Sequence, residues 1–347
     1  MTVLLHTLDA TWSPFVLVAG LLLIGHVAAG EGLFQLVGSW CARVAGGGVA
    51  LFLVTMLAVA LVTAVLNLDT SVVFMTPVAL HAARTKGADE TAFLYGTIFM
   101  SNSASLLLLG SNLTNLLVFS RRGELGSVFA GRMLLPWIAS VGVTILVVLA
   151  WRWRALRRSV RSTAATPVSF TFGPGVVAAI FAVVAMLVFS APALWVFMVG
   201  VAALLYESVA KRRLSLRQAF LIINPMVMSL LFVVAVAVGW FARYSNLTAH
   251  LLRHANVVTT IAMSSVTSLV INNLPAASLF AAHAIAHPFA LLLGLDLGPN
   301  CAVTGALSSL LWLRIARSHQ MKTSLVTFSL VGTVVAVLAM FAAAPLL

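Results

Sequence analysis

The chain is a series of long apolar runs joined by short polar links, and one run is interrupted twice by small polar residues. This interrupted span covers about residues 92–119. Its polar residues are Ser101, Asn102, Ser103, Ser111, Asn112, Thr114 and Asn115. A helix that faces lipid has no use for such residues, because unsatisfied polar groups are costly in hydrocarbon. The pattern predicts a helix that unwinds within the membrane and lines a cavity.

A second interrupted span lies near the end of the chain, at about residues 291–313. Its polar residues are Asp296, Thr304, Ser308 and Ser309. When the two spans are aligned on their closing Leu-Leu pairs, Asn102 falls opposite Asp296. One half therefore offers an amide where the other offers a carboxylate.

Two further apolar runs, at about residues 48–81 and 257–290, are too long for one crossing of a membrane about 30 Å thick. Each is broken near its middle by polar residues: Asn67, Asp69 and Thr70 in the first, Asn272 and Asn273 in the second. We expect two re-entrant helical hairpins with polar tips at mid-depth. A carboxylate at such a depth costs about 2.5–3.5 kcal/mol on insertion scales, which indicates a functional or paired role for Asp69.

The order of hairpin, interrupted helix and closing helix occurs twice, which is typical of an internal repeat. We expect a first repeat in residues 1–150, a basic cytoplasmic linker in 151–167 and a second repeat in 168–347. Other helices are expected at about 14–29, 133–151, 176–188, 194–209, 225–241 and 325–346, with a surface-lying amphipathic arm after the first. The predicted fold is an all-α polytopic membrane protein.

Composition and charge support this fold. The 347 residues are 62% hydrophobic and 8% charged, with a mean hydropathy of +1.10. The net charge of +12 comes from Lys and Arg in the short links between apolar runs. We interpret these residues as setting which links face the cytoplasm, not as a surface that binds nucleic acid. If the linker is cytoplasmic, 15 of the 20 Lys and Arg residues are cytoplasmic, and the two hairpins enter from opposite sides. The repeats are then inverted.

Two carboxylates among amides and hydroxyls suit a small polar solute that moves in exchange for H⁺ or Na⁺. The alternative is that these groups only hold helices together. His81, His283 and His287 are expected at the membrane interface, and a relay of protons is the alternative. Cys41 and Cys301 are read as small buried apolar residues. No cofactor and no metal site are expected.

At these residues the sequence resembles the ion transporter superfamily, and most closely the bacterial arsenite efflux permeases. The resemblance is carried by the following segments: Leu66-Asn-Leu-Asp69, Phe74-Met-Thr-Pro77, Ala104-Ser-Leu106, Ser111-Asn-Leu-Thr-Asn115, Asn272-Asn-Leu-Pro275, Asp296-Leu-Gly-Pro299 and Thr304–Leu313. It implies a multi-pass protein of the bacterial cytoplasmic membrane that extrudes arsenite or antimonite by proton-coupled antiport. Proton coupling then falls to Asp69 and Asp296.

The sequence departs from that family at three points. We expect its first helix to correspond to the third helix of longer permeases, Leu68 replaces an asparagine, and Asn102 replaces an aspartate. Sodium/proton exchange or transport of another small anion therefore stays open as an alternative. A homodimer and a docked cytoplasmic ATPase subunit are also left open.

An enzyme is not expected. An intramembrane aspartyl protease needs Tyr-Asp and Gly-x-Gly-Asp, whereas Asp69 follows Leu68 and Asp296 follows Leu295. Motifs of zinc proteases and serine hydrolases do not occur in the sequence either.

Overall fold

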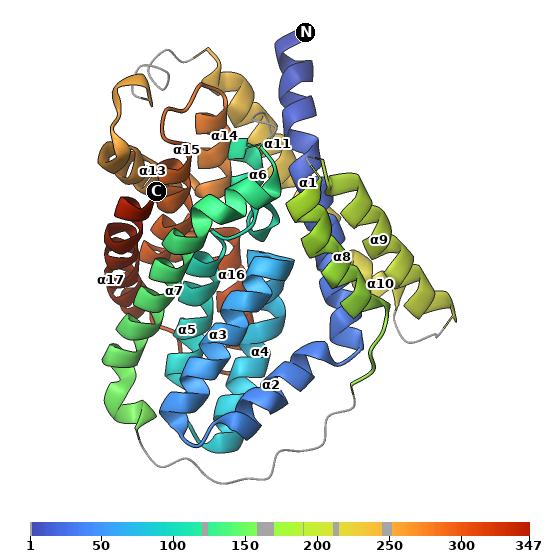
Figure 1. The fold of residues 1–347 in the computed structure, drawn as a ribbon, viewed down its shortest axis with the longest axis vertical. Helices are drawn as coiled ribbons and strands as arrows, with labels where there is room; N and C mark the ends of the chain where they lie inside the picture. The colour runs from blue at the N-terminus through green and yellow to red at the C-terminus, as the bar shows by residue number, and fades with distance from the viewer. Residues whose placement is uncertain (1, 120–123, 158–169, 190, 211–214, 245–251) are drawn as a thin grey trace.

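The computed structural model of the chain describes residues 2–119, 124–157, 170–189, 191–210, 215–244 and 252–347 (Figure 1). Every regular element in these residues is helical, as predicted. The helices of the first half are α1 (Thr2–Gly30), α2 (Leu33–Val44), α3 (Gly48–Leu66), α4 (Leu68–Lys86), α5 (Glu90–Ala104), α6 (Leu113–Phe119) and α7 (Gly126–Leu156). Those of the second half are α8 (Pro174–Val188), α9 (Ala193–Leu205), α10 (Leu216–Ile223), α11 (Pro225–Ala242), α13 (Val257–Ile271), α14 (Asn273–Ala281), α15 (Pro288–Leu297), α16 (Leu307–Ser318) and α17 (Leu325–Ala343).

Several of these helices are long and apolar enough to cross a membrane. Among the described residues they are Thr11–Gly30, Gly48–Leu66, Gly126–Leu156, Arg217–Ala242 and Leu325–Leu346. Shorter apolar helices lie at Pro174–Val188, Ala193–Val209 and Val257–Ile271. Length and composition therefore support the multi-pass membrane protein that the apolar runs predicted.

Helix boundaries differ from the sequence expectation at several places. Helix α1 begins well before residue 14 and contains Pro14, and α7 begins at Gly126 instead of near residue 133. Helix α10 was not expected. Most of the expected basic linker lies outside the described residues, and α7 extends through its first part to Leu156.

Each of the two hairpins turns on one asparagine. The φ angle is 90° at Asn67 and 74° at Asn272, values that L-residues rarely adopt. The Oδ1 atom of Asn67 accepts a hydrogen bond from the backbone N–H of Thr70 at 2.8 Å, and that of Asn272 accepts from Leu274 at 3.3 Å. Asparagine serves here because it tolerates positive φ and caps the helix that follows.

The hairpins enter the molecule from opposite ends. In Figure 1 the pair α3–α4 extends from the lower end, beside α2, toward the middle, and the pair α13–α14 occupies the upper part. Helices α5 and α15, which lead into the interrupted spans, likewise approach the middle from opposite ends. This is the inverted arrangement expected from the charge distribution.

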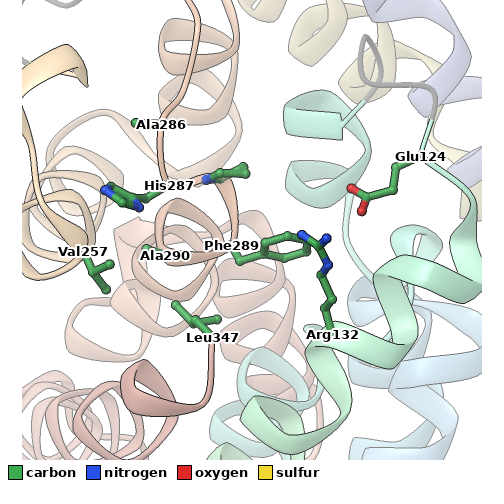
Figure 2. A pocket seen from close by; sticks show the side chains of 9 residues that line it. Glu124, Arg132, Val257, Ala286, His287, Phe289, Ala290 and Leu347 are labelled. Carbon is green, nitrogen blue, oxygen red and sulfur yellow. The ribbon is translucent and has the colours of Figure 1, made fainter.

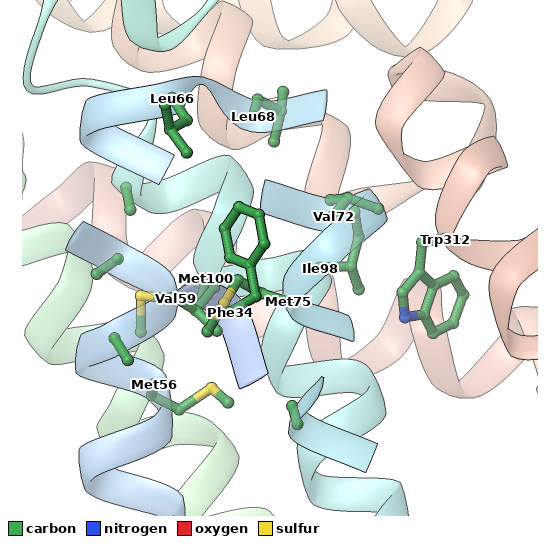
Figure 3. Close-up of a cluster of buried hydrophobic side chains, with 14 of the residues drawn as sticks. Phe34, Met56, Val59, Leu66, Leu68, Val72, Met75, Ile98, Met100 and Trp312 are labelled. Carbon is green, nitrogen blue, oxygen red and sulfur yellow. The ribbon is translucent and has the colours of Figure 1, made fainter. Parts of the chain in front are cut away.

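Buried apolar side chains join the halves. Figure 3 shows part of this core, in which Val72 and Ile98 of the first half lie near Trp312 of α16. Trp312 is fully buried, and its Nε1–H donates to the carbonyl oxygen of Leu94 at 2.7 Å. On the other side of the molecule α1 packs against α8 and α9, with Gly20 and Gly200 at the close approach of α1 and α9.

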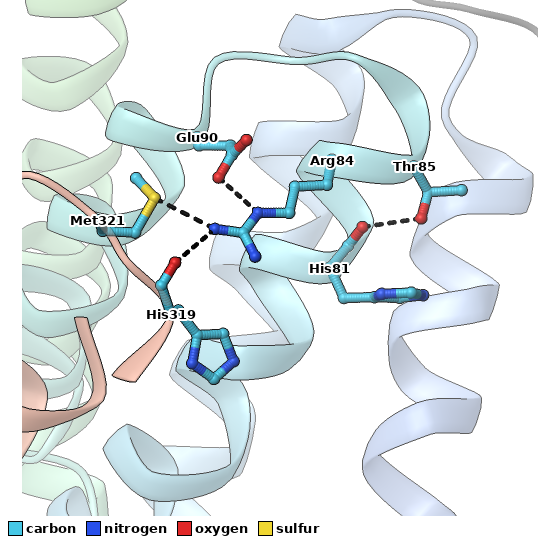
Figure 4. A network of polar contacts seen from close by, with 6 residues as sticks. All are labelled: His81, Arg84, Thr85, Glu90, His319 and Met321. Carbon is cyan, nitrogen blue, oxygen red and sulfur yellow. Dashed lines mark hydrogen bonds and ion pairs between the residues drawn. The ribbon is translucent and has the colours of Figure 1, made fainter. Parts of the chain in front are cut away.

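Polar contacts tie the lower end of the first hairpin to the second half (Figure 4). The Nε of Arg84 lies 2.6 Å from Oε2 of Glu90, and its Nη2 donates to the carbonyl oxygen of His319 at 2.9 Å. Nearby, Arg152 of α7 makes two bonds to Asp89, at 2.6 and 2.8 Å. These contacts fix the ends of α4, α5 and α7.

Candidate functional site

The four breaks in the helices meet at one small cavity of about 30 Å³. Both hairpin tips and both interrupted spans line it. Its lining residues are Leu68, Asp69, Asn112, Leu113, Thr114, Leu231, Asn272, Asn273, Leu274, Ala306, Leu307 and Ser308. Segments far apart in the sequence thus converge where the sequence placed its polar interruptions.

Four helices begin at this cavity. Helices α4, α6, α14 and α16 start at Leu68, Leu113, Asn273 and Leu307, and each of these residues is part of the lining. The N-terminal end of a helix carries unpaired N–H groups and a partial positive charge. The cavity therefore offers a positive field without Lys or Arg in its lining.

Asp296 lies beside this cavity and is almost wholly buried, with 1% of its surface exposed. Its carboxyl group accepts hydrogen bonds from Thr114 Oγ1 at 2.5 Å and Asn112 Nδ2 at 3.0 Å. Ser105 Oγ lies 3.4 Å from it and also donates to the carbonyl oxygen of Asn102 at 2.8 Å, so one proton is shared between two acceptors. All three residues belong to the first half. No Lys or Arg in the described parts of the chain forms an ion pair with Asp296, so its polar partners are neutral groups.

In the first half, Asn102 occupies the position that corresponds to Asp296 in the second half. Its Nδ2 donates to Asn300 Oδ1 at 2.8 Å, and its Oδ1 accepts from Ser308 Oγ at 3.5 Å. Each of the three side chains is at most 1% exposed. Asn102 therefore also reaches across to the other half, but toward an amide and a hydroxyl.

Asp69 is the second carboxylate at the breaks. It occupies the first turn of α4, is partly exposed, and lines the cavity. Opposite it, Asn273 and Asn272 of the second hairpin tip also line the cavity, and Asn272 Nδ2 donates to the carbonyl oxygen of Thr304 at 3.0 Å. The side chain of Thr304 itself is exposed.

Side chains of the first span hold its unwound segment open. Asn115 Nδ2 donates to the carbonyl oxygens of Ser105 and Leu108, at 2.8 and 3.2 Å. Ser111 Oγ accepts from the N–H of Leu108 and donates to the carbonyl oxygen of Ala64, both at 3.0 Å. These bonds replace the helix bonds lost at the break. Asn115 and Ser111 thus shape the site, and neither lines the cavity.

Other predicted residues lie away from the cavity. Ser101 Oγ donates to Ser71 Oγ at 3.4 Å, and Ser103 Oγ accepts from Thr144 Oγ1 at 2.8 Å, so both join α5 to neighbouring helices. Thr70 and Ser309 are buried, with hydroxyl oxygens that find no partner among the described residues.

Sequence reasoning did not name two residues of the site as binding residues, although Ser105 lies in the Ala104-Ser-Leu106 segment that carries the family resemblance. Ser105 bonds to Asp296, and Asn300 bonds to Asn102. Each lies inside one of the interrupted spans, and its polar character within an apolar run was the available signal.

Larger cavities lie toward the ends of the molecule. One of about 580 Å³ is lined by Glu124, Arg132, His287 and Phe289, among others, and Figure 2 shows these side chains around it. The guanidinium carbon of Arg132 lies 5.4 Å from the centroid of the Phe289 ring. Another of about 360 Å³ lies between α2 and α4, with His81 and His319 in its wall.

Inverted hairpins and broken helices that meet at a buried polar site are the architecture of secondary transporters. The chain belongs to the family described as CitMHS, citrate transporter, which matches residues 2–299. Membership of a transporter family agrees with the sequence prediction, while arsenite as substrate stays a prediction.

Curated relatives carry the name of transporters, and a solved structure shares the fold. An uncharacterized transporter of Mycobacterium tuberculosis is 26% identical over 147 residues, which cover 42% of this chain and 34% of the relative. One of Synechocystis is 31% identical over 121 residues, 34% of this chain and 20% of that relative. The match thus spans about a third or less of these relatives. The crystal structure of the Alcanivorax borkumensis YdaH transporter, described as having an unusual topology, resembles this fold with a TM-score of 0.61 at 14% identity, covering 99% of this chain and 86% of YdaH.

Proposed function

We propose that the protein is a secondary active transporter that couples the movement of a small polar solute to a cation, with Asp296 and Asp69 as the coupling residues. One observation carries the proposal. The carboxylate of Asp296 is held across the interface of the two halves by Thr114 and Asn112, beside the cavity where the four breaks meet. A buried carboxylate without a cationic partner is suited to bind and release a cation when the halves move relative to each other.

The coupling ion of this proposal is the proton, and Na⁺ is the alternative. A carboxylate that takes up H⁺ becomes neutral without needing a full shell of oxygen ligands. Asp296 has hydroxyl and amide donors around it, which suits the exchange of a proton between its two forms.

For the solute, our first candidate is arsenite or antimonite, moved outward across the bacterial cytoplasmic membrane. Arsenite at neutral pH is an uncharged trihydroxide, which amides and hydroxyls bind through hydrogen bonds alone. The cavity offers such groups in Asn112, Thr114, Asn273 and Ser308, with no Lys, Arg or His in its lining.

Citrate or another small organic anion is the second candidate, and a different observation favours it. Four helices begin at the cavity, and helix N-termini attract anions. The name of the family points to the same substrate.

Transport, not catalysis, is the activity that we assign to this site. A homodimer and an associated cytoplasmic ATPase subunit stay predictions. Both are tested by purifying the protein in mild detergent with and without the products of neighbouring genes and measuring the mass of the particle.

The experiment that tests the proposal is solute uptake into everted membrane vesicles, with and without an imposed proton gradient. Arsenite, citrate and Na⁺ are supplied in parallel, and vesicles without the protein serve as the control. Gradient-dependent accumulation of arsenite supports the first candidate, and accumulation of citrate supports the second. If none of the three solutes moves faster than in control vesicles, the proposal fails.

A further inference from the structure

The two polar clusters at the breaks are counterparts in an internal pseudo-symmetry. Asp296 and Asn102 are as far apart in the sequence as Ser308 and Thr114 are. Thr114 donates to Asp296, and Ser308 donates to Asn102. In each half, a residue near the end of the helix before the break bonds to a hydroxyl at the start of the helix after the break in the other half. Asp296 of α15 bonds to Thr114 of α6, and Asn102 of α5 bonds to Ser308 of α16.

The counterparts differ in charge and in the number of donors. Besides Thr114, Asp296 has Asn112 as a donor and a longer contact with Ser105, whose hydroxyl also donates to the carbonyl oxygen of Asn102. At the same separation along the chain, Ala306 occupies the place of Asn112 and Pro299 that of Ser105, and neither supplies a side-chain donor. The second cluster is therefore poorer in donors, in agreement with a neutral amide at position 102.

Asn300 completes the second cluster. It is fully buried, and its Oδ1 accepts from Asn102 while its Nδ2 finds no partner among the described residues. A buried N–H without an acceptor is costly. Helix α17 fixes the backbone here, because a Cβ at Gly332 would collide with the carbonyl oxygen of Asn300. A carboxylate in this cluster would have this donor and the hydroxyl of Ser308 as partners.

We propose that Asn102, Asn300 and Ser308 form the uncharged counterpart of the Asp296 site, in which a hydrogen bond between two amides stands where a coupling cation would bind. Each transport cycle then moves one coupling cation fewer than it would if both pseudo-symmetric sites held a carboxylate. This inference rests on the proposed function, because it concerns the stoichiometry of coupled transport.

The test compares wild-type protein with Asn102→Asp and Asn300→Asp in proteoliposomes at a proton gradient of one pH unit, without membrane potential. The solute is whichever of arsenite or citrate the wild type accumulates. Each added coupled proton multiplies the equilibrium accumulation ratio by about tenfold, since about 1.4 kcal/mol corresponds to a factor of ten. We expect each variant to show this increase. Asn300→Asp keeps the observed bond from Asn102, so it is the variant less disturbing to packing.

A swap variant sharpens the test. Asp296→Asn alone should lose coupling, and Asn102→Asp combined with Asp296→Asn should regain the wild-type accumulation ratio, because the carboxylate has only moved to the pseudo-symmetric position. Glu90→Gln in the wild-type background is the control. It removes a carboxylate from the Arg84 ion pair, away from the cavity, and should leave the ratio unchanged.

The outcomes separate this inference from the proposed function. If the wild type transports against a gradient but Asn102→Asp or Asn300→Asp, inserted in the membrane, keeps the wild-type ratio, the inference alone fails. If the wild type shows no gradient-driven transport, both fail. The wild-type ratio is a check that needs no variant, since Asp69 and Asp296 allow at most two coupling charges per solute. A third charge would overturn the inference.

Discussion

Thr114 of the first half donates a hydrogen bond of 2.5 Å to the carboxylate of Asp296 in the second half. Both side chains are at most 1% exposed, so the bond lies in an environment that solvent does not screen. It joins the start of α6 in the first half to the end of α15 in the second half. When one half moves relative to the other, this hydrogen bond must either break or move together with both helices.

Thr114→Val removes the hydroxyl and nearly preserves the shape. A hydrogen bond to a charged group contributes about 1.5–3 kcal/mol, so we expect kcat/KM for gradient-driven transport to fall about 10- to 100-fold. Thr114→Ser retains the donor and should stay close to wild type. Initial rates in proteoliposomes measure both variants, and equal rates for Val and Ser would show that the hydroxyl has no role.

Asp296→Asn and Asp69→Asn each remove one carboxylate at the breaks. Because an amide does not take up a cation, we expect either variant to insert normally but to lose the response of transport to an imposed gradient. Glu90→Gln is the matched control, since it removes a carboxylate from the exposed ion pair with Arg84 and should leave the response intact. Wild-type gradient dependence in either Asp variant would remove that residue from the site.

Gly332→Ala should damage the site from a distance. The added Cβ would collide with the carbonyl oxygen of Asn300, which α17 holds in place beside Asn102. Backbone must shift to make room, so we expect a large loss of transport together with a lower unfolding temperature. Gly142→Ala is the control, because nothing lies within 4 Å of a Cβ at that position. Thermal unfolding and transport of the two variants should differ clearly, and similar values would contradict the packing argument.

Asp89→Asn should lower stability without altering the coupling ratio. Asp89 and Arg152 form two bonds, and their side chains are only 13% and 30% exposed. Losing charge-assisted bonds of this kind should cost about 1–3 kcal/mol of the free energy of unfolding. The loss is measured by thermal or denaturant unfolding in detergent. Glu90→Gln should cost less than about 1 kcal/mol, because solvent screens the more exposed Arg84 pair.

The tip of the first hairpin can be tested through its backbone. Asn67 combines φ 90° with ψ 167°, a region that favours glycine, and it caps the N–H of Thr70. Asn67→Ala loses the cap and keeps the strain, so we expect a loss of about 2 kcal/mol. Asn67→Gly relieves the strain and should be less damaging. A Gly variant that unfolds at the same temperature as the Ala variant would show that strain at this tip is unimportant.

The sequence by itself determined where the helices break. Polar residues inside apolar runs have no stable place in hydrocarbon, so the positions of Asn67, Asn102, Asn272 and Asp296 along the chain are enough to mark the breaks. The distribution of Lys and Arg predicted opposite directions for the two hairpins, because Lys and Arg are enriched in the cytoplasmic loops of membrane proteins. Local rules of this kind need only neighbours in the sequence.

Only the tertiary structure decided which of these polar residues meet. It placed Asp296 against Thr114, and it brought Asn300 to Asn102. It also turned Ser103 toward Thr144, away from the cavity. The first two pairs join residues about 180 to 200 positions apart, whose meeting depends on how two inverted halves pack. Spacing along one helix carries no information about the side chain that the other half presents, so the partners of each buried polar group are fixed by packing alone.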